Sequence, residues 1–435
     1  MTVRRRNFLA GAGALSAAPL LGATTPAHAD VRPPQRPVST GAQVLADSGW
    51  AALAGQKVGV VSNPTGILDD RTHIVDTMHA SGAVDVVAVF GPEHGFRGTA
   101  QAGDSEGNHI DPRTGIMVYD AFGAEAPKLE GFYRQSGVET VVFDIQDVGA
   151  RFYTYIWTMY RAMHAAAMTG ARFVVLDRPN PIGGYARGPM MQPGFTSGVG
   201  KEEILLQHGM TVGELALMFN AEYLPADTGG PRVTDLEIIR TEGWRRDVTA
   251  HGTTVPWVLP SPNMPTPDTA VVYPGMGLFE ATNMSEGRGT TRPFELIGAP
   301  YIDYHWAEAL ATKDIPGLEF REAYFTPTFS KNANKLCGGV QVHVTDPSRA
   351  EALVASAHML VEARRLYSSD PDPAMRFDWR GDGGRWIDLL SGSDRYQSML
   401  EAGASAEEIV GAWAGETAAW NARREPYLLY EGPSR

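Results

Sequence analysis

Three chemically active side chains follow a short apolar run near residue 90. The run Val84–Phe90 is rich in valine, a glycine and a proline end it, and Glu93, His94 and Arg97 follow between further glycines. A continuous run of this composition predicts a strand that is buried on both faces, as in a parallel sheet. A carboxylate, an imidazole and a guanidinium therefore stand just past the end of a central strand, where open α/β sheets bind their ligands.

Carboxylates in similar surroundings recur along the chain. Six of them lie in turn-like contexts next to glycines or aromatic residues, namely Glu93, Asp144, Asp147, Asp177, Glu280 and Glu286. Two carboxyl groups that face each other across a cleft suit glycoside hydrolysis, because one can protonate the leaving oxygen while the other stays ionised. His94 could serve such a pair as a neighbour or relay. Asp147 and Asp177 each have an alternative role as the N-cap of a following helix.

Other kinds of site find less support in the sequence. A metal site built from His94 with Asp144 or Asp147 stays an alternative, although no H-E-x-x-H or H-x-x-E-H spacing is present. Residues 103–107 match G-x-S-x-G, but they lack the apolar strand and the helix that flank a nucleophile elbow. No G-x-G-x-x-G follows the first predicted strand, so a dinucleotide site is not expected.

Arginines and aromatic residues accompany the carboxylates. Arg151, Arg178 and Arg288 lie in the same predicted turns, and guanidinium groups bind carboxylates through paired hydrogen bonds. Five aromatic residues in or beside these turns could stack on a sugar face, namely Tyr153, Tyr155, Trp157, Trp257 and Phe279. Trp157 shares a helical stripe with other apolar residues, which favours a position in the core.

A repeated pattern of strand, polar turn and helix positions these residues. Buried strands are predicted at residues 57–62, 84–90, 116–119, 138–143 and 172–176, with helices at 41–54, 72–81, 126–136 and 155–169. This alternation predicts an α/β fold with a doubly wound, mostly parallel sheet. The carboxyl ends of parallel strands share one edge, so eight polar residues are expected to meet in one cleft, namely Asn63, Glu93, His94, Asp144, Asp147, Asp177, Arg178 and Asn180.

The pattern changes to α+β in the second half of the chain. A helix is predicted at residues 211–220, where Thr211 and Glu214 have the spacing of a capping box. A half-exposed strand at 236–240, an irregular proline-rich segment at 257–274, a strand at 338–344 and helices at 347–367 and 405–421 follow. The predicted domains are a signal peptide (1–29), a Pro-rich linker (30–40), a catalytic α/β domain (41–215) and a smaller α+β domain that closes the cleft (216–435).

Composition and charge narrow the class of protein. A chain of 435 residues is longer than a single hydrophobic core usually supports, which predicts two domains. The apolar content of 43% is that of a soluble globular protein. The net charge of -13 argues against nucleic acid or an anionic membrane as a partner. Arg4–Arg6 and Ala27–Ala29 flank an Ala/Gly-rich stretch, which predicts a twin-arginine (Tat) export signal, and no other run is long enough to span a bilayer. The single cysteine, Cys337, excludes an internal disulfide and is expected in a buried strand.

Long stretches of the chain resemble one family. The sequence contains FGPEHGFRG (90–98), FDIQDVGARFYTYIWTM (143–159), LDRPNPIGG (176–184), PSPNMPT (260–266) and EATNMSEGRGTTRPFELIGAP (280–300). These motifs are similar to those of the bacterial NamZ-type exo-β-N-acetylmuramidases. The resemblance implies a Rossmann-like N-terminal domain, a smaller C-terminal domain and an active site between them. It implies release of N-acetylmuramic acid (MurNAc) from the non-reducing end of peptidoglycan glycans that lack stem peptides.

The resemblance also suggests roles for single residues. Glu93 of the GPEHG motif would be the general acid, its partner would be Asp144 or Asp147, and Glu286 and His94 are further catalytic candidates. The expected substrate-binding residues are Asn63, Arg97, Arg151, Tyr155, Asp177, Arg178, Asn180, Asn263, Asn283 and Arg288. Among these, Arg151, Arg178 or Arg288 would meet the lactyl carboxylate of the sugar.

The expected partner is a MurNAc-GlcNAc glycan, with no cofactor, no metal and no membrane span, and the sequence does not fix the oligomeric state. The export signal predicts an extracellular, cell-wall or periplasmic location. A metal-dependent hydrolase or amidase and a non-catalytic muramyl-glycan binding protein stay as alternatives.

Overall fold

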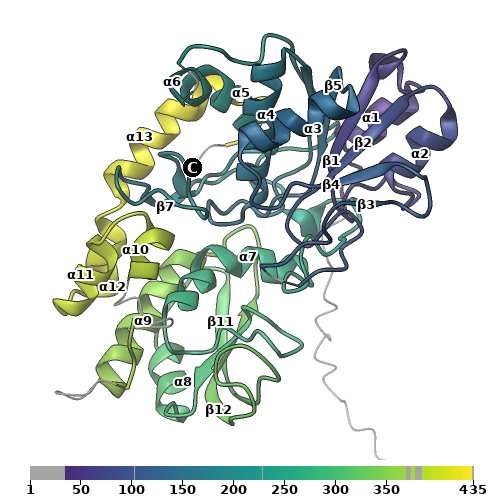
Figure 1. Cartoon of the computed structure of the whole chain (residues 1–435). Coiled ribbons are helices and arrows are strands. Elements are labelled where there is room, and N and C mark those ends of the chain that lie inside the picture. The colour runs from purple at the N-terminus through teal and green to yellow at the C-terminus, as the bar shows by residue number, and fades with distance from the viewer. Residues whose placement is uncertain (1–34, 102, 228, 369–373, 378–384, 434–435) are drawn as a thin grey trace, which may run out of the picture. The chain divides into compact units, whose positions relative to one another are not determined.

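A seven-stranded sheet forms the centre of the first half of the chain. The computed structural model describes residues 35–433 apart from 102, 228, 369–373 and 378–384. The strands lie in the order β3-β4-β2-β1-β5-β6-β9 (Figure 1). They span Lys57–Ser62 (β1), Asp85–Gly91 (β2), His109–Ile110 (β3), Met117–Asp120 (β4), Thr140–Asp144 (β5), Arg172–Leu176 (β6) and Leu236–Ile239 (β9). The β3–β4 pair is antiparallel and the other pairs are parallel, so the predicted doubly wound, mostly parallel α/β fold is confirmed.

Alternate residues of the central strands point into two separate apolar layers. On β5, Val142 packs in one layer, whereas Val141 and Phe143 pack in the other. The first layer includes side chains of helices α1 (Gly41–Asp47) and α2 (Ile74–Ser81). The second includes those of α3 (Ala126–Ser136), α4 (Tyr155–Thr169) and α5 (Val212–Met218). Successive strand side chains point to opposite faces, and both faces are covered, so these strands appear in the sequence as continuous apolar runs.

Local sequence determines where several of these helices begin and end. Thr211 and Glu214 form the predicted capping box at the start of α5. Gly137 and Gly170 adopt the left-handed conformation and end α3 and α4, a conformation that glycine adopts without strain. The helices that precede β5 and β6 therefore have fixed C-terminal ends, which sets the positions of the turns that follow them.

A three-stranded antiparallel sheet organises the second half of the chain, in the order β10-β12-β11. Its strands are Leu296–Ala299 (β10), Leu318–Phe325 (β11) and Cys337–Val344 (β12), and helices α8 (Tyr304–Ala311) and α9 (Ala352–Tyr367) pack on it or on each other. The chain ends in α10 (Arg385–Ser391), α11 (Arg395–Glu401), α12 (Ala406–Gly411) and α13 (Ala414–Arg424). Helix α13 lies against a two-stranded sheet of β7 (Arg187–Met190) and β8 (Leu205–Gln207), as Figure 1 shows. A short helix, α6 (Leu224–Asp227), lies between α5 and β9.

One segment differs from its predicted structure. Residues 257–274 were expected to be irregular because they are rich in proline, but helix α7 occupies Pro267–Met276. The side chain of Thr266 caps this helix by accepting a hydrogen bond from Thr269, and Pro267 stands in the first turn, where its missing N–H has no cost. The proline-rich composition therefore marks the start of a helix rather than its absence.

Two further expectations need correction. The predicted single helix at 405–421 is two helices, α12 and α13. Strand β9 lies beyond the predicted domain boundary at residue 215, yet it pairs with β6 and belongs to the first sheet. Residues 35–435 form one compact unit, and the proposed division into two domains stays a prediction.

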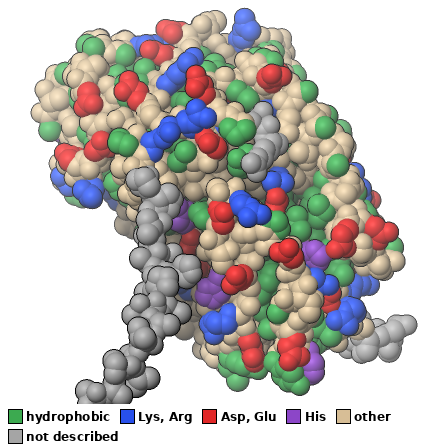
Figure 2. Space-filling view, turned by 180° about the vertical axis from the view of Figure 1, so that it is seen from behind, with side chains coloured by type: hydrophobic (Ala, Val, Ile, Leu, Met, Phe, Trp, Pro, Cys, Tyr) green, Lys and Arg blue, Asp and Glu red, His purple; other side chains and the backbone are tan. Residues whose placement is uncertain are grey.

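The remaining sequence expectations concern the termini and the surface. Residues 1–29, the expected export signal, lie outside the described residues, as does the linker up to residue 34. None of the described helices is long and apolar enough to cross a membrane. Cys337 is buried in β12, as predicted. Figure 2 shows acidic and basic side chains interspersed over one face of the molecule.

Candidate active site

A cleft opens beside the carboxyl end of β2. One part has a volume of about 140 Å³ and is lined by Glu93 and Tyr153 from the first half of the chain and by Tyr273 from α7. A second part of about 610 Å³ includes Phe329 and Trp386. Four residues line both parts, namely Glu93, Asn263, Glu280 and Arg288, so the two parts form one cleft. Its size suits a ligand of one or a few sugar rings.

Glu93 stands in the turn after β2, and both of its carboxylate oxygens are held. Oε1 accepts a hydrogen bond of 2.8 Å from the backbone N–H of Gly103, and Oε2 accepts one of 3.1 Å from the hydroxyl of Thr154. Thr154 directly precedes α4. The side chain is partly exposed to the cleft, so it is fixed in direction yet accessible to a ligand.

The loop that delivers Gly103 to Glu93 is organised by Glu106. The carboxylate of Glu106 accepts backbone hydrogen bonds from Phe96 at 3.0 Å and from Thr99 at 3.1 Å. Gly95 has a φ of +84°, and a Cβ atom there would meet the Glu106 side chain at 2.1 Å. Only glycine therefore allows the turn to close against Glu106, and the closed turn sets the position of the Gly103 N–H.

His94 lies beside Glu93 on the wall of the cleft. It is buried, and its backbone has a φ of +71°, a left-handed conformation that is uncommon outside glycine and asparagine. Its Nδ1 lies 3.2 Å from the carbonyl oxygen of Ala100. A hydrogen bond to a carbonyl requires the proton on Nδ1, which leaves Nε2 as an acceptor in the neutral ring.

A cluster of charges forms the opposite side of the cleft. The Nη2 atom of Arg288 lies 2.7 Å from Oε1 of Glu280, and its Nε lies 3.1 Å from Oε1 of Glu286. Glu286 also forms a salt bridge of 2.7 Å with Lys331. Burial opposes the charge on Arg288, but the two carboxylates outweigh burial and raise its pKa above the usual value. Arg288 is therefore a permanent cation that keeps Glu280 oriented.

Aromatic side chains complete the walls. Tyr153, Tyr273 and Phe294 all line the cleft, and their rings meet edge to face, with centroids 5.7 Å apart for Tyr153–Tyr273 and 4.7 Å for Tyr273–Phe294. Phe294 also lies 5.0 Å from the Arg288 guanidinium. Burial raises the pKa of Tyr153 and of Tyr273 well above the usual value, so both hydroxyls stay protonated and can donate.

The structure does not bring Asp144 or Asp147 into the lining of the cleft. Asp144 is fully buried, and Arg178 binds both of its oxygens at 2.5 and 3.0 Å. Asp147 accepts a 2.7 Å hydrogen bond from Gly149 N–H and pairs with the buried His208 at 3.2 Å. Asp144 is the last residue of β5 and Asp147 follows it, but partners from neighbouring turns hold both inside the protein. Glu280, one of the six carboxylates in turn-like contexts, lines the same cleft as Glu93 instead.

The predicted binding residues divide into two groups. Tyr155, Asn263 and Arg288 line the cleft, as do Glu93 and His94, and Glu286 lines its outer part. The others are held by hydrogen bonds or ion pairs outside that lining, namely Asn63, Arg97, Arg151, Asp177, Arg178, Asn180 and Asn283. Arg97, for example, is bound by Asp76 and Asp111, and Arg151 donates to three backbone carbonyls.

Several of these buried residues join distant segments. Asp177 accepts hydrogen bonds from Gly213 N–H, from Thr211 and from Tyr430 near the C-terminus. Burial raises the pKa of Asp177 to about 6, and these hydrogen bonds oppose that rise. Some polar residues at strand ends therefore stabilise the fold, whereas others line the cleft. The sequence alone does not separate the two groups.

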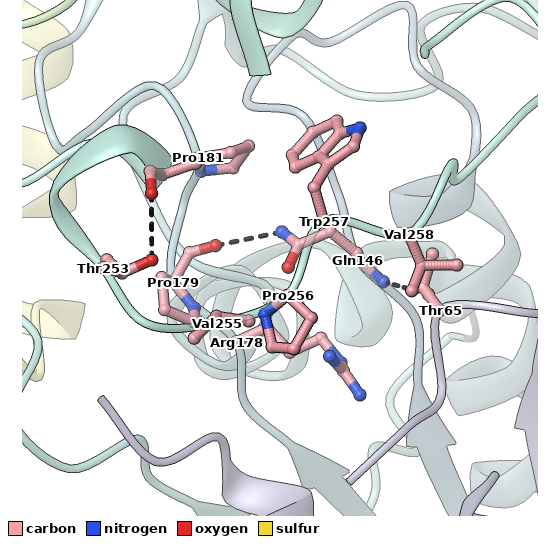
Figure 3. Close-up of a pocket in the computed structure, with 11 residues that line it drawn as sticks. Thr65, Gln146, Arg178, Pro179, Pro181, Thr253, Val255, Pro256, Trp257 and Val258 are labelled. Atoms are coloured by element: carbon pink, nitrogen blue, oxygen red, sulfur yellow. Dashed lines mark hydrogen bonds between the residues drawn. The ribbon is translucent and has the colours of Figure 1, made fainter. Parts of the chain in front are cut away.

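A separate and smaller pocket lies beside the same sheet edge. Trp257 and three prolines line it together with Gln146 and Arg178 (Figure 3). Gln146 bridges its wall, because its side chain donates to the Pro179 carbonyl at 3.0 Å and its backbone N–H donates to Thr65 at 2.9 Å. The guanidinium of Arg178 is engaged by Asp144, so the pocket presents mainly apolar surface.

The residues of the metal alternative do not form one site. Within the described ranges, no group of three or more His, Cys, Asp and Glu side chains could hold a metal ion. The ring of His94 faces Ala100, whereas Asp144 pairs with Arg178 and Asp147 with His208.

Sequence reasoning missed Thr154, Ser261, Phe294 and Lys331. Thr154 and Ser261 both line the cleft and lie inside the motifs at 143–159 and 260–266, where their hydroxyl groups are the local signal. Phe294 and Lys331 carried no signal, because an apolar residue and a lone lysine acquire their roles only from their neighbours in space.

Comparisons with known proteins give one consistent result. Two family models match the chain, "Exo-beta-N-acetylmuramidase NamZ, N-terminal" over residues 58–268 and "Exo-beta-N-acetylmuramidase NamZ, C-terminal" over 271–430. A relative from Bacillus subtilis (strain 168), named peptidoglycan beta-N-acetylmuramidase NamZ, is 42% identical over 395 residues, 90% of this chain and 91% of its own.

Two crystal structures from Bacteroides fragilis NCTC 9343, both described as DUF1343 family proteins, are also similar. They are 32% and 31% identical, with TM-scores of 0.79 and 0.69, and each comparison covers 91% of this chain and 99% of the other. The whole described fold therefore recurs in solved structures.

Proposed function

The chain belongs to the NamZ family of exo-β-N-acetylmuramidases, and we propose that it hydrolyses the terminal glycosidic bond of peptidoglycan glycans with Glu93 as the proton donor. The product is N-acetylmuramic acid released from the non-reducing end. One observation carries the assignment of roles. Glu93 and Glu280 come from opposite halves of the chain and line the same cleft, and their surroundings differ.

The surroundings separate the roles of the two carboxyl groups. Glu280 pairs with Arg288, a fixed cation, so it is the group that stays ionised. It supplies the negative charge that an oxocarbenium-like transition state requires. Glu93 has only uncharged donors on its oxygens, so it is the group that can carry a proton to the leaving oxygen.

The hydrogen bonds of Glu93 also assign the proton to one oxygen. Oε1 faces the backbone N–H of Gly103, which can only donate. Oε2 faces the hydroxyl of Thr154, which can turn and accept. The proton therefore resides on Oε2, passes to the glycosidic oxygen as the bond to C1 breaks, and is replaced from the water whose hydroxyl ends on C1.

Substrate recognition follows from the remaining groups of the cleft. The lactyl carboxylate of the muramyl sugar is an anion, and Arg288 is the cation that lines both parts of the cleft. The rings of Tyr153, Tyr273 and Phe294 offer apolar surface to the sugar, as aromatic walls do in carbohydrate sites. The acidic protein would repel an acidic polymer at long range, so binding depends on this local cation.

We also propose that the protein is exported through its twin-arginine signal and acts on cell-wall material outside the cytoplasmic membrane. The pattern at Arg4–Arg6 and Ala27–Ala29 supports this location. Cell fractionation of the host, with and without Arg4 and Arg5 changed to Lys, tests it. Retention of the unaltered protein in the cytoplasm would contradict it.

The activity is tested by release of p-nitrophenol from its β-N-acetylmuramic acid glycoside in the presence of EDTA. Wild-type protein is expected to release it, and Glu93→Gln is expected to lose at least about 10²-fold in kcat. Glu308→Gln, an exposed glutamate on α8, is the matched control and should not change the rate. Activity that EDTA abolishes would support the metal-dependent alternative, and binding of the sugar without turnover would support the non-catalytic one.

A further inference from the structure

Four charged side chains form an unbroken chain that ends in the cleft. Lys331 Nζ lies 2.7 Å from Glu286 Oε2, Glu286 Oε1 lies 3.1 Å from Arg288 Nε, and Arg288 Nη2 lies 2.7 Å from Glu280 Oε1. The side chains of Lys331 and Glu286 are 3% exposed, whereas those of Arg288 and Glu280 are about one-fifth exposed. Lys331, which does not line the cleft, can therefore act on a ligand only through the other three side chains.

Lys331 is also bound to the segment that carries Glu280. Its ammonium group donates to the carbonyl of Phe279 at 2.6 Å and to that of Thr282 at 3.0 Å. These carbonyls flank Glu280 at the end of the 3₁₀ helix η4 (Gly277–Ala281). The lysine thus fixes both Glu286 and the backbone on either side of Glu280.

The loop between Glu286 and Phe294 carries Arg288, and its own backbone conformation helps to fix the position of this arginine. Gly287 has a φ of +76°, and a Cβ atom there would lie within 2.8 Å of two backbone oxygens. Phe294 has a φ of +62°, donates its backbone N–H to Glu286 O at 2.6 Å, and places its ring 5.0 Å from the Arg288 guanidinium. A bulky residue in this conformation is strained, and such strain persists where the surroundings require it.

The signs of the four charges have a consequence for ligand binding. Arg288 faces two carboxylates, so these three groups alone would give the wall a net negative charge. Lys331 neutralises Glu286, and the four charges then balance. Burial lowers the pKa of Lys331, and Glu286 is the main group that opposes this effect and keeps the charge on the amine.

We propose that Lys331 is a positioning residue that neutralises Glu286 and so leaves the charge of Arg288 available to an anionic sugar and to Glu280. This inference rests on the proposed function, because it concerns the carboxylate of the muramyl substrate. Lys331 selects for the acidic sugar without touching it. Its loss would leave Arg288 to neutralise Glu286 as well as Glu280, so the wall would carry a net negative charge and repel the lactyl carboxylate.

The test uses two substrates that differ in one charge. These are the p-nitrophenyl glycoside of N-acetylmuramic acid and the same compound with its lactyl carboxylate converted to an amide. Lys331→Met is expected to raise KM for the acidic glycoside by at least about tenfold and KM for the amide by less than about threefold. An equal loss on both substrates would show a merely structural role for Lys331 and overturn the proposal.

A variant that lacks both buried charges, those of Lys331 and Glu286, provides an independent test. Lys331→Met combined with Glu286→Gln is expected to bind the acidic glycoside better than Lys331→Met alone, because the excess negative charge beside Arg288 is gone. A double variant that binds the acidic glycoside no better than Lys331→Met would contradict the proposal.

If circular dichroism shows that Lys331→Met does not fold, the single variant Glu286→Gln tests the proposal instead. It should lower KM for the acidic glycoside and not for the amide, and an unchanged or higher KM for the acidic glycoside would overturn the inference.

Binding is followed by titration calorimetry with free N-acetylmuramic acid, so that the result does not depend on turnover. Inactivity of the wild-type protein on both glycosides would defeat the proposed function itself. Activity of the wild type with equal responses of the variants on both substrates would defeat only the role of Lys331.

Discussion

The hydroxyl of Thr154 lies within hydrogen-bond distance of Oε2 of Glu93, at 3.1 Å, and so joins the turn after β2 to the start of α4. Two elements that are far apart in the sequence thereby fix the direction of one carboxyl group. Oε2 is the oxygen to which we assign the transferable proton, so the contact bears directly on catalysis.

Thr154→Val keeps the shape of the side chain and removes the hydroxyl. We expect kcat to fall about tenfold with little change in KM, because Glu93 loses the group that orients its reactive oxygen. Thr154→Ser retains the hydroxyl and should retain most of the activity. Steady-state kinetics on the acidic glycoside measure both, and a serine variant as slow as the valine variant would refute the role of the hydroxyl.

Arg288→Lys keeps a positive charge but loses the guanidinium group, whose nitrogens contact Glu280 and Glu286 at the same time. Lysine cannot reproduce both contacts, so kcat/KM should fall at least tenfold. Arg134→Lys, on the exposed face of α3, is the matched control and should have no effect. Kinetics near wild type for Arg288→Lys would mean that charge alone suffices at this position.

Tyr153→Phe tests whether the hydroxyl at the cleft wall binds substrate. Its hydroxyl is buried beside Ser261 in the cleft wall, and a bound sugar could accept its proton. We expect KM to rise about five- to tenfold. Tyr396→Phe is a close control, because the Tyr396 hydroxyl is also buried beside a serine, Ser356, but its ring packs against Trp413 in the C-terminal helices. Equal kinetic effects of the two variants would argue against a role in binding.

Asp144→Asn separates a structural from a catalytic role for this aspartate. The carboxylate and Arg178 form a fully buried ion pair, and removal of one partner leaves the other charge unpaired. We expect the free energy of unfolding in urea to fall by about 3–5 kcal/mol, while the protein that remains folded turns over substrate within a few-fold of wild type. A stable variant with no activity would instead return Asp144 to the catalytic group.

Glu202 should make stability depend on pH. Burial and the neighbouring carboxylate of Asp227 raise the pKa of Glu202 to about 7. A carboxyl group whose pKa is raised in the folded state stabilises it at low pH, and this contribution is lost as pH rises from about 4.5 through 7. Glu202→Gln should therefore raise Tm relative to wild type at pH 8 and leave it unchanged at pH 4.

The neighbouring Glu203 is exposed, so Glu203→Gln should leave the pH dependence of Tm unaltered. Thermal unfolding followed by circular dichroism at both pH values measures the two variants. A rise in Tm for Glu202→Gln at pH 4 as large as at pH 8 would show that desolvation of the charge is not the cause.

Local sequence patterns predict the central sheet correctly and single out Glu93 as a candidate. Apolar runs such as Lys57–Ser62 predict their strands correctly, because a strand buried on both faces needs apolar residues at every position. Glu93 was identifiable because glycines and a proline end β2 directly before it. Periodicity and turn chemistry are local properties, and sequence records them directly.

Which carboxylates line the cleft depends on the tertiary structure. Asp144 and Glu280 have similar local signals, but Arg178 neutralises Asp144 inside the fold, whereas the packing of α7 and η4 brings Glu280 to the cleft. Lys331 acquires its role only from Glu286, which lies in another loop. Burial and pairing of charges depend on contacts between distant segments, and no local pattern of residues encodes those contacts.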